Sequence, residues 1–342
     1  MKYKVAIIGC GAIFERHYQS IKHNDDFELV AICDIQKSIV DSLSKRLNVA
    51  GFSTFEDCLE HSNANFYVIA TPNANHYEQA MACIQKNKHY IVEKPACLKF
   101  SNLEKLMHAT NSSDVNGYCV LQVRLNESVN VVRECLKKNL LGKIRGVSLV
   151  QRWQRPVEYF SGWRAIPEIG GGTLHEVGIH YIDILQYLFG RPNIVSSKVY
   201  NVKHKATEIE DTVYSIMDFG DFGGTLEVTI AAEPLNLECS LSILGSNGYL
   251  KLGGKALNVI ESYNFLSNGA REKFENLIEE KKSSVINIEP NDYGSYLGSC
   301  PNHTQLYENL DQFRIEKATE AIRMIEEIYE KTMLQNRFGG KK

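Results

Sequence analysis

The stretch Lys4–Ile21, "KVAIIGCGAIFERHYQSI", decides the fold of the amino-terminal part of the chain. A short apolar run, typical of a buried parallel strand, leads into a glycine turn and then a helical pattern. Gly9 permits the tight turn, and Gly11 lets the backbone approach a pyrophosphate lying on the helix amino terminus. Phe14 stands at the third glycine position of G-x-G-x-x-G, which predicts a slightly displaced helix. The turn residues expected to border a dinucleotide are Gly9, Gly11, Ala12 and Ile13.

An acidic residue strengthens this interpretation. Asp34 ends the second apolar run, "LVAICDIQ", where a ribose-binding carboxylate is expected. A carboxylate there repels a 2′-phosphate, so the sequence favours NAD over NADP. The alternative is that Asp34 is only a turn residue at the end of a strand.

Strand and helix patterns alternate through the first third of the chain. The runs "KVAIIG", "ELVAICD", "NFYVIAT" and "HYIVEK" are apolar, and residues 76–87 have apolar side chains at helical spacing. This alternation predicts a Rossmann-type domain over residues 1–120, a doubly wound α/β fold with a parallel sheet. Thr71, Pro72 and Asn73 follow the third run, where they border the same ligand or cap a helix.

The pattern changes after about residue 121. Leu226, Val228 and Ile230 alternate with polar residues, and so do Cys239, Leu241 and Ile243. Period-two alternation predicts a large, mostly antiparallel sheet with one solvated face. Apolar residues at helical spacing near the end predict one long helix over about 305–333. We therefore expect an α+β substrate-binding and oligomerisation domain over residues 121–335.

Composition excludes several classes of protein. The chain has 342 residues, a formal net charge of -3 and no apolar run long enough for a membrane span, so neither nucleic acid nor membrane is an expected partner. Nine cysteines without a C-x-x-C pair fit a reducing cytoplasm, with cysteine used as a small apolar filler. We predict a cytoplasmic protein.

The segment Gly170–Gly190, "GGGTLHEVGIHYIDILQYLFG", contains two histidines that could suggest a zinc site. The zinc motif H-E-x-x-H needs its histidines four residues apart, on one face of a helix. His175 and His180 are five residues apart, roughly 140° around a regular α-helix. We therefore predict no metal, and interpret the segment as a glycine turn opening a helix that carries one functional histidine.

A second candidate for chemistry follows the fourth apolar run. Glu93, Lys94 and Pro95 stand where ligands bind in parallel sheets, and Pro95 favours an extended or turn conformation for Lys94. A nearby cationic ring and partial desolvation would both lower the pKa of a lysine, so that it could act as a general base. The alternative is a solvated loop lysine.

Together these motifs resemble the Gfo/Idh/MocA family of sugar oxidoreductases. The resemblance rests on G-C-G at 9–11, T-P-N with His76, E-K-P at 93–95, and G-x-H-x-x-D at Gly178, His180 and Asp183. It implies that Lys94 and His180 form an acid/base pair beside NAD, with Asp183 an orienting or packing neighbour. Glu176 stands where many members have aspartate, and is a further catalytic candidate. The cofactor residues that it implies, besides the glycine turn, are Asp34, Thr71, Pro72, Asn73, His76, Glu93 and Lys94.

A narrower resemblance comes from residues 120–129 and 159–172. Both look like the nucleotide-sugar 3-dehydrogenases of bacterial surface-polysaccharide synthesis, which oxidise the C3 hydroxyl of UDP-GlcNAc or its uronic acid, UDP-GlcNAcA, before transamination. The resemblance implies that Gln122, Arg124, Trp163, Arg164 and His180 line a sugar-nucleotide pocket. Arginine suits such a pocket because its fork binds phosphate or carboxylate. Interface packing and surface charge are the alternatives for Trp163 and the arginines.

The expected function is NAD-dependent oxidation of the C3 hydroxyl of a UDP-linked N-acetylamino sugar in lipopolysaccharide or O-antigen sugar biosynthesis. The alternatives are a dehydrogenase of a free sugar or inositol, a 3-ketoreductase of a nucleotide sugar, and a non-catalytic NAD or sugar sensor. The expected partners are the UDP-amino sugar, a downstream aminotransferase and further copies of the chain, as a dimer or tetramer. The sequence leaves open whether Lys94 or His180 is the base.

Overall fold

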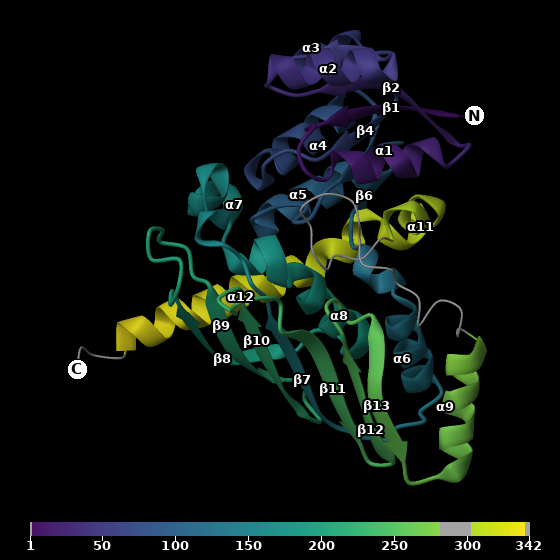
Figure 1. The fold of residues 1–342 in the computed structure, drawn as a ribbon, viewed down its shortest axis with the longest axis vertical. Helices are drawn as coiled ribbons and strands as arrows, with labels where there is room; N and C mark the ends of the chain where they lie inside the picture. Colours follow the sequence, from purple (N-terminus) through teal and green to yellow (C-terminus); the bar gives the residue numbers. More distant parts are fainter. Residues whose placement is uncertain (1, 281–301, 339–342) are drawn as a thin grey trace. The chain divides into compact units, whose positions relative to one another are not determined.

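The computed structural model describes residues 2–280 and 302–338, with side chains described up to residue 332. The chain divides into two compact units. The first comprises residues 2–121 with 302–322, and the second comprises residues 122–280 with 323–338. Each unit is built around its own sheet, as Figure 1 shows.

The first unit contains a six-stranded parallel sheet in the order β3-β2-β1-β4-β5-β6. The order reverses between β1 and β4, as in doubly wound folds, and the predicted Rossmann architecture is confirmed. The four predicted strands are present, whereas the short strands β3 and β6 were not predicted. The bounds are β1 Tyr3–Ile8, β2 Phe27–Cys33, β3 Ala50–Phe52, β4 Phe66–Ile69, β5 His89–Val92 and β6 Gly117–Cys119.

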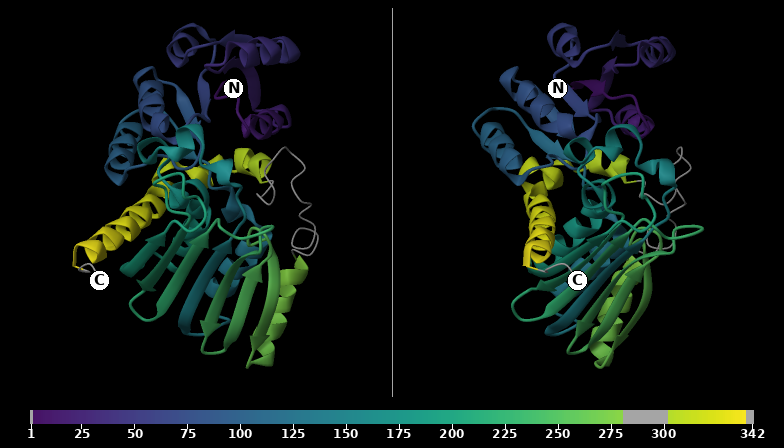
Figure 2. Two further views of the ribbon diagram at one scale, coloured as in Figure 1. Left: turned by 60° about the vertical axis from the view of Figure 1, so that its left-hand side comes forward. Right: turned by 90° about the vertical axis from the view of Figure 1, so that its left-hand side faces the viewer.

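Helices lie on both faces of this sheet (Figures 1 and 2). Both faces of the central strands are therefore buried, which explains their continuous apolar runs. Residues 5–8 and 66–69 are at most 2% exposed. The helices are α1 Phe14–Lys22, α2 Lys37–Leu47, α3 Phe55–His61, α4 His76–Gln85 and α5 Phe100–Asn111, with the 3-10 turn η1 Asn73–Asn75 before α4.

The prediction of one helix over about 305–333 is wrong at its amino end. This part consists of α11 (His303–Glu308), the 3-10 turns η6 (Leu310–Phe313) and η7 (Ile315–Ala318), and α12 (Thr319–Phe338). Arg314 interrupts the helical path with an extended backbone, φ −52° and ψ 147°. It forms a β-bridge with Tyr118 of the edge strand β6 and donates to Asn116 Oδ1 at 3.1 Å. These tertiary interactions override the helical spacing of Leu310 and Phe313.

The second unit contains a seven-stranded sheet in the order β13-β12-β11-β7-β10-β9-β8. All neighbouring strands are antiparallel except β7 and β10, which confirms the predicted mostly antiparallel sheet. The predicted alternation is also confirmed, since Leu226, Val228, Leu241 and Ile243 are at most 1% exposed. The bounds are β7 Ile144–Arg152, β8 Asn193–Tyr200, β9 Thr212–Asp218, β10 Gly223–Thr229, β11 Glu238–Gly245, β12 Gly248–Gly253 and β13 Val259–Phe265.

The helices of the second unit include a π turn that the sequence did not predict. This turn, η5 (Leu174–Gly178), runs directly into α8 (Ile179–Phe189). The other elements are η2 Gln122–Leu125, α6 Glu127–Lys137, η3 Val157–Tyr159, η4 Gly162–Ala165, α7 Pro167–Gly170 and α9 Asn268–Glu280. Across the described residues, none of the helices has both the length and the apolar character needed to span a bilayer. The eight described cysteines are all buried, as expected for apolar fillers.

Candidate functional site

The glycine turn after β1 has the shape that a dinucleotide needs. Gly9 has φ +95°, and a Cβ there would lie 2.3 Å from the carbonyl oxygen of Ala70, so only glycine fits. A Cβ at Gly11 would meet no atom of the described residues within 4 Å. Packing within the chain therefore does not explain Gly11, whereas close approach of a pyrophosphate to the amino end of α1 does. Phe14 begins α1 and is buried, and stacks on Tyr18. The turn fits a dinucleotide.

Asp34 helps to shape the same turn. One carboxylate oxygen accepts the Cys10 backbone N–H at 2.9 Å, and the other accepts the Gln36 backbone N–H at 2.8 Å. The side chain remains partly exposed, so its other lone pairs can accept from ribose hydroxyls. Asp34 is therefore both an anchor of the turn and a candidate ribose ligand.

Asp34→Ala is expected to weaken NAD binding about tenfold or more and to reduce the preference for NAD over NADP. The reason is that the variant loses charge-assisted hydrogen bonds and the repulsion of a 2′-phosphate. Fluorescence titration with both cofactors measures the ratio of dissociation constants, and Asp41→Ala on the exposed face of α2 is the matched control. An unchanged ratio in Asp34→Ala would contradict the assignment.

The T-P-N loop is tied to the E-K-P segment by His76. Its Nδ1 lies 2.7 Å from the Pro95 carbonyl oxygen, and its Nε2 lies 2.9 Å from the Thr71 carbonyl oxygen. The hydroxyl of Thr71 donates to Gln79, and Asn73 is buried in η1. His76 thus connects two loops at the carboxyl ends of β4 and β5, which is the ligand side of the sheet. Contact of Thr71, Pro72, Asn73 and His76 with NAD stays a prediction.

The E-K-P segment follows β5 directly. Lys94 is partly exposed, and its peptide bond to Pro95 is cis. The Lys94 backbone N–H donates to Oε2 of Glu93 at 3.1 Å. Lys94 therefore leaves the sheet on the ligand side, as predicted, with its main chain held by the preceding side chain.

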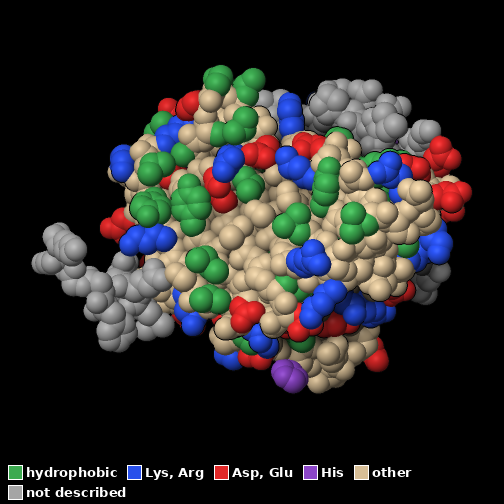
Figure 3. Space-filling model, turned by 90° about the horizontal axis from the view of Figure 1, so that it is seen from below, with side chains coloured by type: hydrophobic (Ala, Val, Ile, Leu, Met, Phe, Trp, Pro, Cys, Tyr) green, Lys and Arg blue, Asp and Glu red, His purple; other side chains and the backbone are tan. Residues whose placement is uncertain are grey.

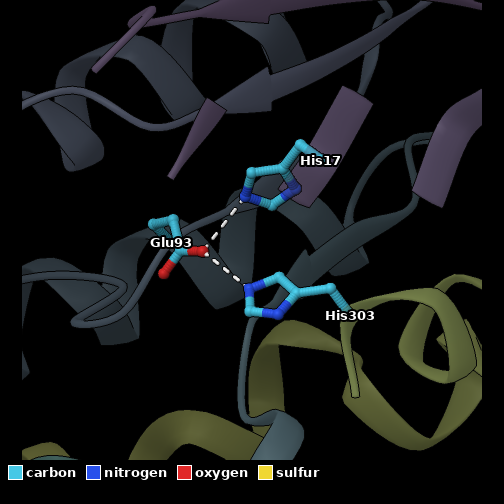
Figure 4. Close-up of side chains that lie close together, drawn as sticks. All are labelled: His17, Glu93 and His303. Atoms are coloured by element: carbon cyan, nitrogen blue, oxygen red, sulfur yellow. Dashed lines mark hydrogen bonds and ion pairs between the residues drawn. The ribbon is translucent and has the colours of Figure 1, made fainter. Parts of the chain in front are cut away.

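Glu93 lies at the centre of a buried cluster with His17 of α1 and His303 of α11, shown in Figure 4. Its Oε1 is 3.0 Å from His17 Nε2 and 3.5 Å from His303 Nε2. Burial opposes ionisation of Glu93, but the two histidines outweigh it and hold the pKa of the carboxyl well below its usual range. Burial lowers the pKa of His303.

The side chains of His17, Glu93 and His303 are near enough to one another to ligate one metal ion. The sequence did not predict this juxtaposition. Local spacing offered no signal because the members are 76 and more than 200 residues apart. Glu93 Oε1 already accepts from His17, and its Oε2 accepts from the Lys94 N–H. Hydrogen bonds thus account for the carboxylate, and a role for Glu93 in cofactor binding stays a prediction.

In the second unit, a glycine turn leads into the helix that carries His180. Gly172 has φ +93°, and a Cβ there would lie 2.8 Å from the Tyr329 hydroxyl and 2.9 Å from Oε1 of Glu210. Glu210 Oε1 accepts from the Thr173 N–H at 2.8 Å and from the Tyr329 hydroxyl at 2.6 Å. Burial raises the pKa of Glu210. This carboxyl and Tyr329 of α12 fix the start of the π turn.

Glu210→Gln is expected to remove one component of the pH dependence of stability. Because the folded pKa of Glu210 is raised, its contribution is full below the unfolded pKa and is lost as pH rises through the folded pKa. The stability of the variant relative to the wild-type chain should therefore increase as pH rises from the ordinary glutamate value of 4.5. Denaturant unfolding at several pH values measures this difference. Exposed Glu208→Gln is the control, and a pH-independent difference in Glu210→Gln would contradict the expectation.

The π turn changes the geometry assumed for His175 and His180. The 140° separation predicted from the sequence applies to a regular α-helix, and Leu174–Gly178 is not one. His175 is buried, donates from Nδ1 to the Gly171 carbonyl at 2.6 Å and stacks on Tyr329. His180 is partly exposed, whereas Ile179 and Tyr181 beside it are at most 2% exposed. His175 therefore packs inside the second unit, and a functional role for His180 stays a prediction.

Glu176 of the π turn accepts hydrogen bonds from Arg164, a predicted pocket residue, and from Tyr159. Its Oε2 accepts from Arg164 Nε at 3.0 Å and from the Tyr159 hydroxyl at 3.3 Å. The Arg164 guanidinium also lies 4.4 Å from the ring of Trp163. The structure thus brings Arg164, Trp163 and Glu176 together, and gives Glu176 a role in holding an arginine.

Asp183 and Arg124 form a bidentate ion pair inside the second unit. Arg124 Nε donates at 2.6 Å and its terminal nitrogen at 2.5 Å, and the two residues are 6% and 1% exposed. Gln186 donates to the same carboxylate at 2.8 Å. Asp183 therefore orients Arg124. Its predicted role beside the acid/base pair of Lys94 and His180 stays a prediction. Gln122, two residues before Arg124, is also buried.

Comparisons with known proteins show the family. Residues 3–120 match a family described as "Oxidoreductase family, NAD-binding Rossmann fold", and residues 129–251 match the GFO/IDH/MocA C-terminal domain. The chain belongs to the Gfo/Idh/MocA oxidoreductase family. It is therefore an NAD-dependent enzyme, and NAD is its cofactor.

Two solved structures resemble nearly the whole chain. The WlbA dehydrogenase from Bordetella pertussis, in complex with NADH and UDP-GlcNAcA, is 26% identical with a TM-score of 0.86, over 97% of this chain and 96% of that one. The WlbA dehydrogenase from Chromobacterium violaceum, with the same two ligands, is 25% identical with a TM-score of 0.85, over 97% and 94%. Glucose-6-phosphate 3-dehydrogenase of Bacillus subtilis is 24% identical over 242 residues, 70% of this chain and 68% of that one.

Proposed function

We propose that this NAD-dependent sugar or polyol dehydrogenase oxidises the C3 hydroxyl of a UDP-linked N-acetylamino sugar, UDP-GlcNAc or UDP-GlcNAcA, to the 3-keto sugar. The observation that carries the proposal is the likeness over 97% of the chain to dehydrogenases that bind NADH and UDP-GlcNAcA. The arginines Arg124 and Arg164 support it, because each is held in place by a carboxylate and a guanidinium is the side chain best suited to a phosphate or carboxylate.

In the proposed reaction the chain's own residues bind and orient the cofactor and the sugar, and one of them takes up a proton. The turn at Gly9 and Gly11, with the amino end of α1, holds the pyrophosphate, and Asp34 holds the ribose. NAD, when bound, supplies the hydride acceptor. Lys94 or His180 takes the proton of the sugar hydroxyl. Arg124 and Arg164, with Gln122 and Trp163, bind the nucleotide sugar.

The absorbance at 340 nm tests the function directly. The purified chain is mixed with NAD and one candidate from a panel of UDP-GlcNAc, UDP-GlcNAcA, glucose 6-phosphate, glucose and myo-inositol. A 3-aminotransferase with glutamate removes any 3-keto product, because oxidation of the alcohol is expected to be uphill. A signal with one UDP-sugar supports the proposal, and a signal only with another panel member overturns it.

The relative glucose-6-phosphate 3-dehydrogenase favours a second candidate, C3 oxidation of a sugar phosphate. The same arginines would then bind one phosphate group instead of a pyrophosphate. A signal with glucose 6-phosphate and none with the UDP-sugars would select this candidate.

We further propose that the chain assembles with copies of itself through the outer face of the seven-stranded sheet. Figure 3 shows hydrophobic side chains interspersed with charged ones on the surface seen from below. Apolar side chains on the strands of this sheet that are 44–55% exposed are Val195, Tyr200, Tyr214, Ile216, Leu244 and Tyr249. Light scattering during gel filtration tests this assembly. A role in lipopolysaccharide or O-antigen sugar biosynthesis, a downstream aminotransferase and a cytoplasmic location stay predictions.

A further inference from the structure

Inside the first unit, a chain of buried hydrogen bonds ends at the main chain of Lys94. His17 Nδ1 lies 2.9 Å from the hydroxyl of Tyr307, and His17 Nε2 lies 3.0 Å from Glu93 Oε1. The other oxygen of Glu93 accepts the Lys94 backbone N–H at 3.1 Å. Tyr307 lies on α11, His17 on α1 and Glu93 directly after β5, so the hydrogen bonds connect three elements.

The direction of each hydrogen bond follows from its partners. A carboxylate only accepts, so His17 Nε2 carries the hydrogen that points to Glu93. Burial and the charge of Glu93 raise the pKa of Tyr307 well above its usual range, so its hydroxyl keeps a proton to donate to His17 Nδ1. His303 lies edge-on to the His17 ring, at 5.4 Å between centroids, and confines the carboxylate from the other side. All three bonds are then compatible with one arrangement of protons.

A buried charged network of this kind is not explained by stability alone. Removing a carboxylate and imidazoles from water costs free energy that hydrogen bonds only partly offset, and apolar side chains of similar volume are often as stabilising. What such a network does supply is a single, directed geometry. Here that geometry is imposed on the residue that carries the candidate acid/base group.

We infer that Tyr307, His17 and Glu93 are positioning residues that fix the Lys94 main chain and align the lysine with the cofactor. His17 lies on α1, whose amino end is the candidate pyrophosphate site, so the same helix holds the cofactor and, through Glu93, the lysine. The inference rests on the proposed role of Lys94 in the reaction. A loosened network would misplace the lysine without removing it.

Two substitutions interrupt the chain at different points. Tyr307→Phe removes one hydroxyl and keeps the ring that packs on Phe27, and Glu93→Gln replaces an acceptor by an amide that cannot accept both N–H groups. The controls are Tyr18→Phe on α1 and Glu104→Gln on α5, which make the same chemical changes at less buried positions.

Hydrogen exchange of the Lys94 amide gives a readout that needs no substrate. Pro95 has no amide hydrogen, so a short peptide that ends at Pro95, across positions 92–95, or ¹⁵N-lysine labelling isolates the signal. Both variants should exchange this amide faster than the wild-type chain and the controls, with no comparable change in β1. Unchanged exchange in both variants overturns the inference.

Kinetics give the second readout, on the panel substrate that the wild-type chain oxidises. The turnover number should fall about 3- to 10-fold in Tyr307→Phe and about 10- to 100-fold in Glu93→Gln, with the KM and the NAD dissociation constant nearly unchanged. In the double variant, Tyr307→Phe should cause no further fall in the turnover number, because Glu93→Gln has already interrupted the hydrogen-bond network. The inference is overturned if the two substitutions lower the turnover number multiplicatively in the double variant, or if they weaken only the binding of NAD. Faster exchange with no activity on any UDP-sugar would instead contradict the proposed function alone.

Discussion

Lys94→Ala is expected to lower the turnover number about 10²- to 10⁴-fold, which is the usual contribution of a positioned acid or base. His180→Ala should have an effect in the same range. The NAD dissociation constant should change far less than the turnover number in both, because the glycine turn and Asp34 make the main contacts with the dinucleotide in the proposed arrangement. The measurement is the coupled 340 nm assay with the active UDP-sugar, beside a fluorescence titration with NAD.

Matched controls separate this loss from a general effect of the substitutions. Lys105→Ala lies on an exposed position of α5, and His108→Ala lies one turn further along the same helix. Both should retain turnover near the wild-type value. If Lys94→Ala and His180→Ala both retained turnover as well, the acid/base assignment would be wrong even if the substrate were correct.

Asp183→Ala is expected to reduce the free energy of unfolding of the second unit by about 3–5 kcal/mol, because it leaves the Arg124 guanidinium buried without its carboxylate. Both tryptophans, Trp153 and Trp163, lie in this unit, so tryptophan fluorescence during denaturant unfolding reports on it. Asp221→Ala, whose carboxylate is 81% exposed and 3.8 Å from Lys143, should cost less than about 1 kcal/mol.

A double variant distinguishes a buried ion pair from simple loss of packing. Replacing both partners, as Arg124→Met with Asp183→Leu, removes both charges and keeps much of the side-chain volume. It should be clearly more stable than Asp183→Ala. If the double variant lost as much free energy of unfolding as the two single variants together, the two residues would act independently. Its turnover should still be low, since Arg124 is a proposed ligand of the nucleotide sugar.

The sequence predicted the parts of this protein that depend on local chemistry. Gly9 is required by a positive φ, which a strand followed by G-x-G predicts. The alternation around Leu226 and Leu241 identified a one-sided sheet, because side chains in a strand alternate between its faces. Both predictions needed only neighbouring residues.

The sequence failed where distant residues compete with local preference. Leu310 and Phe313 have helical spacing, yet Arg314 adopts an extended backbone to bridge Tyr118, almost 200 residues earlier. The same holds for the π turn at Leu174–Gly178, which is fixed by Glu210 and Tyr329. No local pattern reports these partners.

The sequence by itself thus determined the two sheets and the dinucleotide turn, because each depends on short-range geometry. The roles of Lys94 and His180 rest on a family resemblance and stay predictions. Only the tertiary structure decided how polar side chains are used. It placed Glu93 between His17 and the Lys94 main chain, and it assigned Asp183 to Arg124 and Glu176 to Arg164. Buried charges must find partners, and the partner is whichever group folding brings within hydrogen-bond distance, whatever its separation along the chain.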